Sequence, residues 1–234
     1  MDFSLSPLNP NTRDTYEEEY QEGGLYDHQG GSRQTYLFAR YFHRHFRVPL
    51  EWEFTVLDMG CALGDALPVW RQHYRQQARF CGCDVSPTAI RRAKEKFGNL
   101  ADFFVGGFEE LNQPYDVIYC SNVLEHFEAY EQIATHLLKH CKILYVITPF
   151  NELKKRSPMR LKHGKFHVTS FYQDSFDFLT ESGLAAKINT KVFRAPGAWS
   201  WTFKYRCYRL FRSSFLGDPI EQEPLQIGYE IFAR

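Results

Sequence analysis

The sequence predicts an α/β fold in which a seven-stranded, mostly parallel sheet carries helices on both faces and a small cap lies between the last two strands. Three observations support this prediction. Apolar, β-branched runs alternate with segments of helical period, which is typical of a parallel sheet flanked by helices. A glycine turn follows the first run, and Asp84 ends the second. Ligands of such folds bind where neighbouring strands end, so the turn and the aspartate also predict a binding site.

The apolar runs locate the strands. Five of them alternate with helical segments, and two more follow a polar loop. We expect strands at about 54–60, 79–85, 101–106, 115–121, 142–149, 185–193 and 225–233. They would form a single domain over residues 51–234, preceded by an N-terminal helical or lid segment over residues 1–50.

Helix signals occupy the gaps between the runs. Ser86 is a suitable cap for a helix that starts with Pro87, because serine accepts free backbone N–H groups of a first turn and proline fits its first position. Ile133, Leu137 and Leu138 form one apolar stripe at helical spacing. We expect helices at about 65–77, 87–97, 130–140 and 170–182, the last ended by Gly183, and a helical cap element between the last two strands.

The composition is that of a folded, water-soluble chain. A hydrophobic fraction of 44% over 234 residues is enough for one buried core. The longest apolar run, 143–150, falls well short of the roughly 20 residues of a bilayer-spanning helix. Residues 1–7 lack the basic flank and apolar stretch of a secretory signal, so we expect a cytoplasmic protein. The six cysteines lie mostly in apolar runs, as buried reduced thiols do.

Opposite charges cancel over the whole chain but not locally. The 28 basic and 28 acidic residues give no net charge, so no overall field attracts the protein to nucleic acid or to an anionic membrane. Residues 1–30 nevertheless carry seven acids and one base, a net charge of −6, while residues 154–165 carry six bases and no acid. A polyanionic partner would therefore have to meet a local patch.

The strongest local signal is the turn after the first strand, which reads Asp58-Met59-Gly60-Cys61-Ala62-Leu63-Gly64-Asp65. A glycine turn that opens a helix lets a ligand approach backbone N–H groups. Asp84, at the end of the second strand, stands where a carboxylate accepts hydrogen bonds from a ribose. Together, the turn and Asp84 predict an adenosine-type ligand.

Charge narrows the choice of ligand. Aligned with the dinucleotide motif G-x-G-x-x-G, the turn has Ala62 at the second glycine and Asp65 at the third, which disfavours a pyrophosphate. No lysine or arginine occurs from 58 to 70, and the absence of G-K-[ST] excludes a P-loop. A cationic ligand suits this site, and S-adenosylmethionine (SAM), with its ammonium and sulfonium groups, has that chemistry.

Further motifs follow the turn in a recognisable order. They are Val105-Gly106-Gly107-Phe108-Glu109-Glu110-Leu111, Tyr115-Asp116-Val117-Ile118 and Ser121-Asn122-Val123-Leu124-Glu125-His126. In order and spacing, residues 51–193 resemble the Rossmann-like domain of class I SAM-dependent methyltransferases. The resemblance is greatest to the methyltransferase type 11, 12 and 23 group, whose members carry a similar Leu-Glu-His after the fourth strand. It implies methyl transfer from SAM.

The resemblance also implies roles for single residues in the cofactor site. Asp58 would hold the methionine ammonium, Asp84 would bind the ribose hydroxyls, and Val85 would pack on the adenine. Where the family has an acid that contacts the adenine amino group, this chain has Gly107, which leaves that contact to the backbone or ring of Phe108. The implied cofactor contacts are Asp58, Gly60, Cys61, Ala62, Gly64, Asp84, Val85, Gly107, Phe108 and Asn122.

An N-terminal segment is a further candidate for the cofactor site. Residues 15–26 resemble segments that fold over the cofactor in this family, and Tyr20 is the contact that the resemblance implies. Tyr16 and Tyr20 lie four positions apart and would share one helix face. Ordinary helix packing is the alternative interpretation.

Histidines near the ends of the fourth and fifth strands are the candidate bases. An oxygen acceptor has to lose a proton, and a histidine with a near-neutral pKa is the usual group to take it. His126 follows the fourth strand, and His163 and His167 lie in the loop after the fifth. We assign His126, His167 and Glu125 as catalytic. Alternatively, His126 orients the following helix, and Glu125 and His167 support helix caps.

A metal site is an open alternative at the same place. Relatives that methylate catechol-like quinone precursors, or the terminal ribose of small RNAs, bind a divalent ion through E-x-x-E-H and a later histidine. Here the motif reads Asn122-x-x-Glu125-His126, with His163 or His167 downstream, and asparagine supplies one charge fewer. The favoured prediction therefore contains no metal.

The acceptor is expected to be a hydroxyl on a small molecule or on a sugar or glycan intermediate. The basic loop 154–165 would receive an anionic acceptor or nucleic-acid phosphates, although a solvated surface loop is its ordinary explanation. Aromatic and basic residues alternate over 199–212, which fits a lid, a helix resting on a membrane surface, or a cap packed on the sheet. An RNA- or nucleotide-modifying enzyme and a noncatalytic SAM-binding module are the alternative functions.

Overall fold

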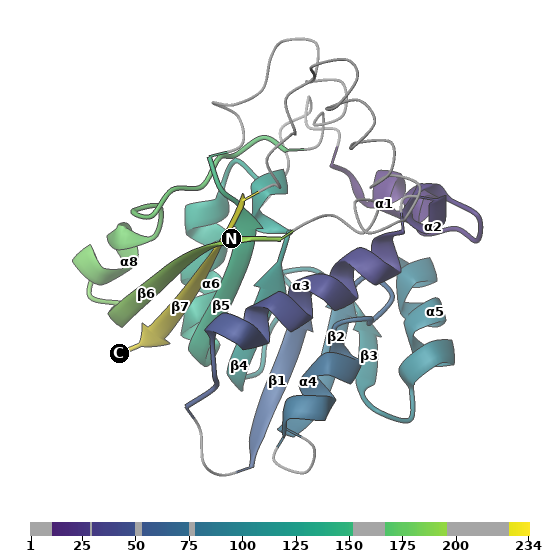
Figure 1. The fold of residues 1–234 in the computed structure, drawn as a ribbon, viewed down its shortest axis with the longest axis horizontal. Helices are drawn as coiled ribbons and strands as arrows, with labels where there is room; N and C mark the ends of the chain where they lie inside the picture. Colours follow the sequence, from purple (N-terminus) through teal and green to yellow (C-terminus); the bar gives the residue numbers. More distant parts are fainter. Residues whose placement is uncertain (1–10, 29, 50–52, 75–77, 152–166, 196–224) are drawn as a thin grey trace, which may run out of the picture.

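The fold is given by a computed structural model, which describes residues 11–28, 30–49, 53–74, 78–151, 167–195 and 225–234. One twisted sheet runs through it, and helices lie on both faces (Figure 1). The N-terminal helices α1 (Arg13–Glu19) and α2 (Leu25–His28) lie beside the carboxyl ends of the parallel strands, and α3 (Gly31–His45) crosses the sheet (Figure 1).

The remaining elements alternate between strand and helix. In chain order they are β1 (Phe54–Met59), α4 (Leu67–Tyr74), β2 (Ala78–Asp84), α5 (Pro87–Phe97), β3 (Asp102–Val105), β4 (Tyr115–Ser121), the 3₁₀ turn η1 (Leu124–His126), α6 (Tyr130–Lys139), β5 (Cys141–Pro149), α8 (Asp177–Glu181), β6 (Ala185–Arg194) and β7 (Leu225–Ala233).

The strand order in the sheet is β3-β2-β1-β4-β5-β7-β6. The pairs from β3 through β5 are parallel, and β7 inserts antiparallel between β5 and β6. The direction of strand order changes beside β1, so the ends of β1, β2 and β4 meet at one edge. In open α/β sheets that switch point is where ligands bind.

Two apolar layers hold the helices on the sheet. Neighbouring strand residues alternate between them: Ile143 belongs to the layer beneath α3, α4 and α5, and Leu144 to the layer beneath α6 and α8. In the first layer Phe42 of α3 stacks on Trp70 of α4 with 5.2 Å between ring centroids. Because both faces are covered, the central strands are mostly apolar, which explains their strong sequence signal.

The structure confirms the seven strands and the mostly parallel sheet. Helix α5 starts at Pro87 with Ser86 as its cap, since the Ser86 side chain accepts a hydrogen bond from the Ala89 N–H, and Gly183 ends α8 with a positive φ of 74°. The five described cysteines are free. Among the described residues, no helix has both the length and the apolarity needed to cross a bilayer.

The predicted helix at 170–182 is too long. Phe171 forms a bridge with Phe150, a turn follows in which Tyr172 N–H bonds to the Ser175 hydroxyl at 2.8 Å, and only α8 is helical. The side chains of Phe171 and Phe176 are fully buried in the apolar layer that also contains Tyr229 of β7, so this segment packs on the sheet ahead of the helix. Four predicted features lie outside the described residues: loop 154–165, His163, segment 199–212 and the cap between β6 and β7.

Candidate functional site

The glycine turn joins β1 to α4 through three residues in the left-handed region. The φ angles of Gly60, Ala62 and Gly64 are 77°, 49° and 75°. The N–H groups of Gly60 and Cys61 both donate to the carbonyl of Cys83 at the end of β2, at 2.8 and 2.9 Å. These bonds fix the turn against the neighbouring strand, so its shape exists before any ligand binds.

Gly60 is required by sterics as well as by its backbone angle. A Cβ atom at this position would lie 2.4 Å from Cγ2 of Val123, which follows β4. The turn therefore packs directly against the chain that leads into η1. This contact brings the predicted cofactor turn and the predicted catalytic segment to the same place.

Asp84 is held by the backbone on both sides. One carboxylate oxygen accepts the Ala62 N–H at 2.9 Å, and the other accepts the Ser86 N–H at 3.0 Å. Its side chain is buried at 6% exposure. Burial raises the pKa of Asp84 to about 6, although these hydrogen bonds favour the charged form. The carboxylate is thus oriented, and each oxygen keeps a lone pair for a ligand hydroxyl.

Asp58 supplies a second buried carboxylate nearby. Its Oδ2 is buried and has no hydrogen-bond partner among the described residues. Burial and then the charge of Asp84 raise the pKa of Asp58 to about 8. Two neighbouring buried acids with raised pKa values form a site that a cation would stabilise.

The segment after β3 borders Val85. The Cβ position of Gly107 lies 3.4 Å from Val85 Cγ1 and 3.1 Å from Glu109 Oε2, and the Gly107 N–H donates to Glu110 at 2.7 Å. The ring of Phe108 is buried and meets Phe127 at 5.2 Å between centroids. The ring therefore packs in the core, so Phe108 itself offers only its backbone for an adenine contact.

Helix α1 is attached to the start of α5. Glu17 accepts hydrogen bonds from the hydroxyls of Ser86 and Thr88 and from the Thr88 N–H at 3.2 Å. Arg92 donates to the carbonyl of Tyr20 at 2.8 Å. Burial alone would raise the pKa of Glu17, but the bonds from Ser86 and Thr88 lower it. Sequence reasoning missed Glu17, because its partners lie far along the chain.

The two N-terminal tyrosines face different parts of the site. Tyr20 packs against the cluster that contains Ala62, and burial followed by the charge of Asp84 raises its pKa. The Tyr16 ring lies 6.0 Å from that of His126. Burial raises the pKa of Tyr16, and the nearby charge of Glu125 raises it further. Tyr16, which sequence reasoning left without a role, thus lies beside the candidate catalytic residues.

The candidate catalytic residues are brought together by residues 167–169, a short segment after loop 154–165 that we call the strap. The N–H groups of Val168 and Thr169 donate to the Glu125 carbonyl at 2.8 and 3.1 Å, and the Thr169 hydroxyl donates to the Phe127 carbonyl at 2.8 Å. These bonds set His167 against His126, with 5.0 Å between ring centroids.

Glu125 is the buried member of this group, at 1% exposure. Its two carboxylate oxygens accept no hydrogen bond of normal geometry from the described residues. Burial raises the pKa of Glu125 to about 7, while His167 and Asn122 favour its charged form. A carboxyl whose pKa is raised toward neutrality, in contact with two imidazoles, is suited to moving a proton.

The same three residues also fit a divalent cation. One ligand atom from each of Glu125, His126 and His167 lies within 4.8 Å of the others. One oxygen and two nitrogens suit Zn²⁺, Fe²⁺ or Mn²⁺ better than Mg²⁺ or Ca²⁺. Asn122, in the left-handed region at φ 56°, donates to Gln226 at 3.3 Å and accepts from Ser121 at 3.3 Å, so its amide is held by neighbours.

The comparisons with known proteins agree with this geometry. The family model described as a methyltransferase domain (Methyltransf_23) matches residues 26–218. The chain belongs to this methyltransferase family. Its sheet order and the similar solved structures show the class I, Rossmann-like fold, and membership of the family identifies a SAM-dependent methyltransferase. The sequence prediction of fold, enzyme class and cofactor is thereby confirmed.

Two solved methyltransferases illustrate the shared fold. One is the plantazolicin methyltransferase BpumL in complex with a pentazolic desmethylPZN analogue and S-adenosylhomocysteine (SAH), with a TM-score of 0.58, 16% identity, and coverage of 95% of this chain and 96% of that one. The other is magnesium protoporphyrin IX methyltransferase of Synechocystis PCC 6803 with bound SAH, with a TM-score of 0.54, 17% identity and 96% coverage of both chains.

A curated relative matches part of the chain. The methyltransferase is 32% identical over 124 residues to the ubiquinone biosynthesis O-methyltransferase of Rickettsia conorii. The match covers 47% of this chain and 43% of the relative, so the chain spans less than half the length of that protein in the match.

Proposed function

We propose that this SAM-dependent methyltransferase methylates a hydroxyl group on a small molecule, with Glu125, His126 and His167 at the acceptor. The observation that carries the proposal is the meeting of these three titratable groups beside the cofactor turn, where Gly60 packs on Val123. The similarity to a protein named as an O-methyltransferase supports an oxygen acceptor. We also propose that Asp58, Asp84 and the glycine turn bind the cofactor.

Methyl transfer to oxygen places a simple demand on these residues. The acceptor oxygen attacks the methyl carbon of SAM, the carbon–sulfur bond breaks, and its electron pair stays on sulfur to give SAH. The hydroxyl proton goes to a base, a role that we assign to His167 or His126. Glu125, beside both, would stabilise the imidazolium that forms. Because the sulfonium is already activated, holding the acceptor in line supplies much of the rate.

We propose a phenol or catechol as the acceptor, in preference to a sugar hydroxyl. A phenol has a pKa near 10, so a base with a near-neutral pKa removes its proton far more readily than that of an aliphatic alcohol. The resemblance to a ubiquinone biosynthesis enzyme supports the same choice. Sugar and glycan hydroxyls are the alternative class.

A metal-assisted version is the second candidate, and the donor cluster of Glu125, His126 and His167 favours it. A divalent ion held there would lower the pKa of an acceptor hydroxyl. Equilibrium dialysis with Zn²⁺, Mn²⁺ and Mg²⁺, on the wild type and on His126→Ala, tests the site. Activity that resists chelation, together with no site lost in His126→Ala, would reject the metal-assisted version.

Two measurements test the main proposal. Calorimetry with SAM and SAH tests the cofactor site: we expect micromolar binding that weakens at least tenfold in Asp84→Ala, and unchanged binding in that variant would reject the assignment of Asp84. SAH release is then followed with catechols, phenols, sugars and RNA as acceptors. Turnover with phenolic compounds supports the proposal. Turnover with RNA alone, or SAM binding without turnover on any acceptor or in metabolite extract, would favour the rival functions.

A further inference from the structure

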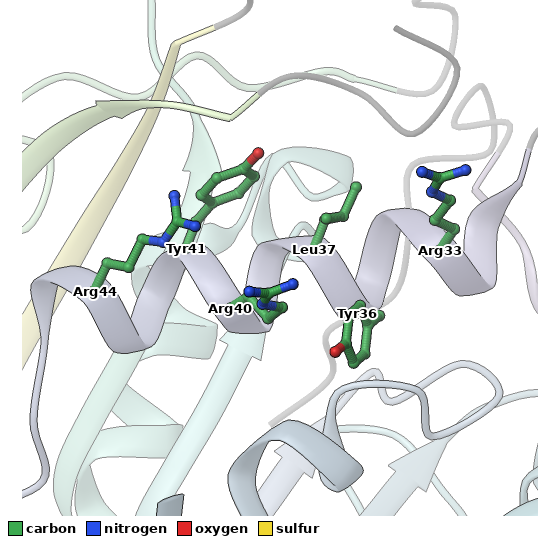
Figure 2. Close-up of a pocket in the computed structure, with 6 residues that line it drawn as sticks. All are labelled: Arg33, Tyr36, Leu37, Arg40, Tyr41 and Arg44. Carbon is green, nitrogen blue, oxygen red and sulfur yellow. The ribbon is translucent and has the colours of Figure 1, made fainter. Parts of the chain in front are cut away.

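The outward face of α3 is a line of positive charge. The helix contains no acidic residue, and its inner face, with Ala39 and Phe42, is buried on the sheet. Arg33, Arg40 and Arg44 are exposed along the other side. Figure 2 shows their guanidinium groups spread along the helix, from Arg33 near its start to Arg44 near its end.

These arginines border a shallow hollow of about 320 Å³. The hollow is lined by Arg33, Tyr36, Leu37, Arg40, Tyr41 and Arg44, all of them from α3 (Figure 2). Tyr36 is 38% exposed, which is unusual for a large apolar side chain in this protein. The surface thus combines cationic groups with an exposed aromatic ring.

The three guanidinium groups have no anionic partner within the described part of the chain. The ion pairs found there use Arg91, Arg92, Lys96 and Lys142. Arg40 lies over the Tyr36 ring at 5.8 Å, and Arg44 lies over the Tyr41 ring at 5.2 Å. The two rings hold Arg40 and Arg44 along the helix without neutralising their charge.

The shape of the surface favours a flat anionic partner. From Arg33 to Arg44 the helix axis rises about 16 Å. The helix lies on the sheet along its length, so it does not project as a helix that enters a nucleic-acid groove does. A straight line of arginines beside an exposed tyrosine and a half-buried leucine is the composition that binds headgroups at a membrane interface.

We propose that the α3 face binds the surface of an anionic lipid bilayer. The guanidinium groups of Arg33, Arg40 and Arg44 would contact lipid phosphates, and Tyr36 and Leu37 would lie at headgroup level. The zero net charge of the whole chain does not oppose this, because such attraction acts over about a Debye length and depends on the local patch. The proposal does not depend on the identity of the methyl acceptor.

Flotation of the full chain with vesicles tests the proposal. Vesicles of phosphatidylcholine alone are compared with vesicles that also contain phosphatidylglycerol, at low and high salt. We expect binding only to the anionic vesicles, loss of binding at high salt, and a partition coefficient roughly a hundredfold lower in Arg33→Gln/Arg40→Gln/Arg44→Gln. The matched control, Lys94→Gln/Lys139→Gln/Lys187→Gln, removes the same charge from exposed positions elsewhere and should stay within about twofold of the wild type.

A second variant separates a membrane from other polyanions. Tyr36→Gln/Leu37→Gln keeps all charges, and we expect it to weaken vesicle binding several-fold, because it removes the groups at headgroup level. Thermal unfolding and SAM binding show that each variant is folded. The proposal fails if the wild type does not float with anionic vesicles or if both triple variants bind alike. It also fails if RNA displaces the protein from vesicles while Tyr36→Gln/Leu37→Gln binds vesicles as tightly as the wild type does.

Discussion

His126 and His167 contact each other edge to face, with 5.0 Å between their ring centroids and an angle of 74° between the rings. His126 ends η1, while His167 comes from the strap whose backbone donates to the Glu125 carbonyl. Backbone hydrogen bonds therefore determine the distance between two side chains that the chain brings from different loops. The buried Glu125 carboxylate lies within reach of both.

Replacing His167 tests whether this pair performs proton transfer. His167→Asn keeps a polar side chain but removes the base, so we expect kcat to fall by about 10² to 10⁴ while the Kd for SAM changes less than threefold. His73→Asn, on α4 and exposed, is the matched control and should keep full activity. Acceptor-dependent SAH release and calorimetry give the two readouts. Equal turnover in His167→Asn and the wild type would show that His167 only supports the strap.

The buried acids predict how cofactor affinity depends on pH. The pKa of Asp58 is raised to about 8 by burial and by Asp84, so the native apoprotein holds this proton more tightly than the unfolded chain does. Its stability contribution is therefore greatest below the ordinary pKa of an aspartate and is lost as pH rises toward 8. A cofactor ammonium favours the ionised form, so binding releases the proton.

The expected result is that SAM binds more tightly as pH rises from 6 to 7.5, by up to about tenfold per pH unit. Over the same range the apoprotein should melt at a lower temperature, so that the stabilisation by SAM grows. Asp58→Asn should bind SAM weakly with a flat pH profile. Calorimetry in buffers of different ionisation enthalpy counts the released protons directly. A wild-type affinity independent of pH would contradict the role of Asp58.

Most of the fold could be predicted because its signals are local. The central strands are buried on both faces, so each appears as a continuous apolar run, and Ser86-Pro87 marks the start of α5. The helix predicted at 170–182 failed for the opposite reason. The bridge between Phe150 and Phe171 and a hydrogen bond from the Tyr229 hydroxyl to the Tyr172 carbonyl join segments that are distant in the sequence, and they hold the first part of that segment to the sheet.

The site could be predicted only in part, because some of its contacts join distant segments. The turn and Asp84 are recognisable from their residue types and positions. Glu17, Tyr16 and Gln226 are not, since an N-terminal acid, a tyrosine and a strand glutamine have no distinctive spacing. Only the folded chain brings Glu17 to the start of α5 and Gln226 to Asn122.

The glycine turn offers a matched pair of substitutions. Gly60→Ala introduces a side chain at φ 77° and 2.4 Å from Val123, so we expect the free energy of unfolding to fall by about 2 kcal/mol or more and SAM binding to weaken strongly. Ala62→Gly, at φ 49°, removes a side chain from a strained position and should change stability by less than about 1 kcal/mol. Urea unfolding measures both values.

Removing the Val123 side chain identifies the cause of the Gly60 effect. In Gly60→Ala/Val123→Ala the clash is gone and only the backbone strain is left, so part of the lost stability should return. If the double variant is no more stable than predicted by adding the two single effects, the turn does not pack on Val123 in solution.

The attachment of α1 to the start of α5 through Glu17 predicts that α1 slows the release of bound cofactor. Glu17→Ala removes the bonds to Ser86 and Thr88 at the start of α5, so we expect SAM to dissociate several-fold faster and trypsin to cut at Arg13 more readily. Glu18→Ala, the adjacent exposed acid, removes the same charge and should behave as the wild type. Stopped-flow displacement of SAM by SAH measures the rates. Identical rates in the two variants would show that α1 does not control release.

The position of Glu109 predicts how the adenine amino group is bound in a chain that has Gly107 where the family has an acid. The Oε2 atom of Glu109 lies 3.1 Å from the Cβ position of Gly107, so its carboxylate occupies the space where an acid at position 107 would begin, beside Val85. We expect this carboxylate to accept a hydrogen bond from the adenine amino group. Glu109→Gln should therefore weaken SAH binding about tenfold. The control Glu95→Gln removes an exposed acid on α5 and should have no effect. A second ligand, S-inosylhomocysteine, has an oxygen in place of the amino group and distinguishes a direct contact from a general charge effect. The wild type should bind SAH more tightly than S-inosylhomocysteine, and Glu109→Gln should lose most of that preference. A preference that survives the substitution would assign adenine recognition to the backbone of Phe108 alone.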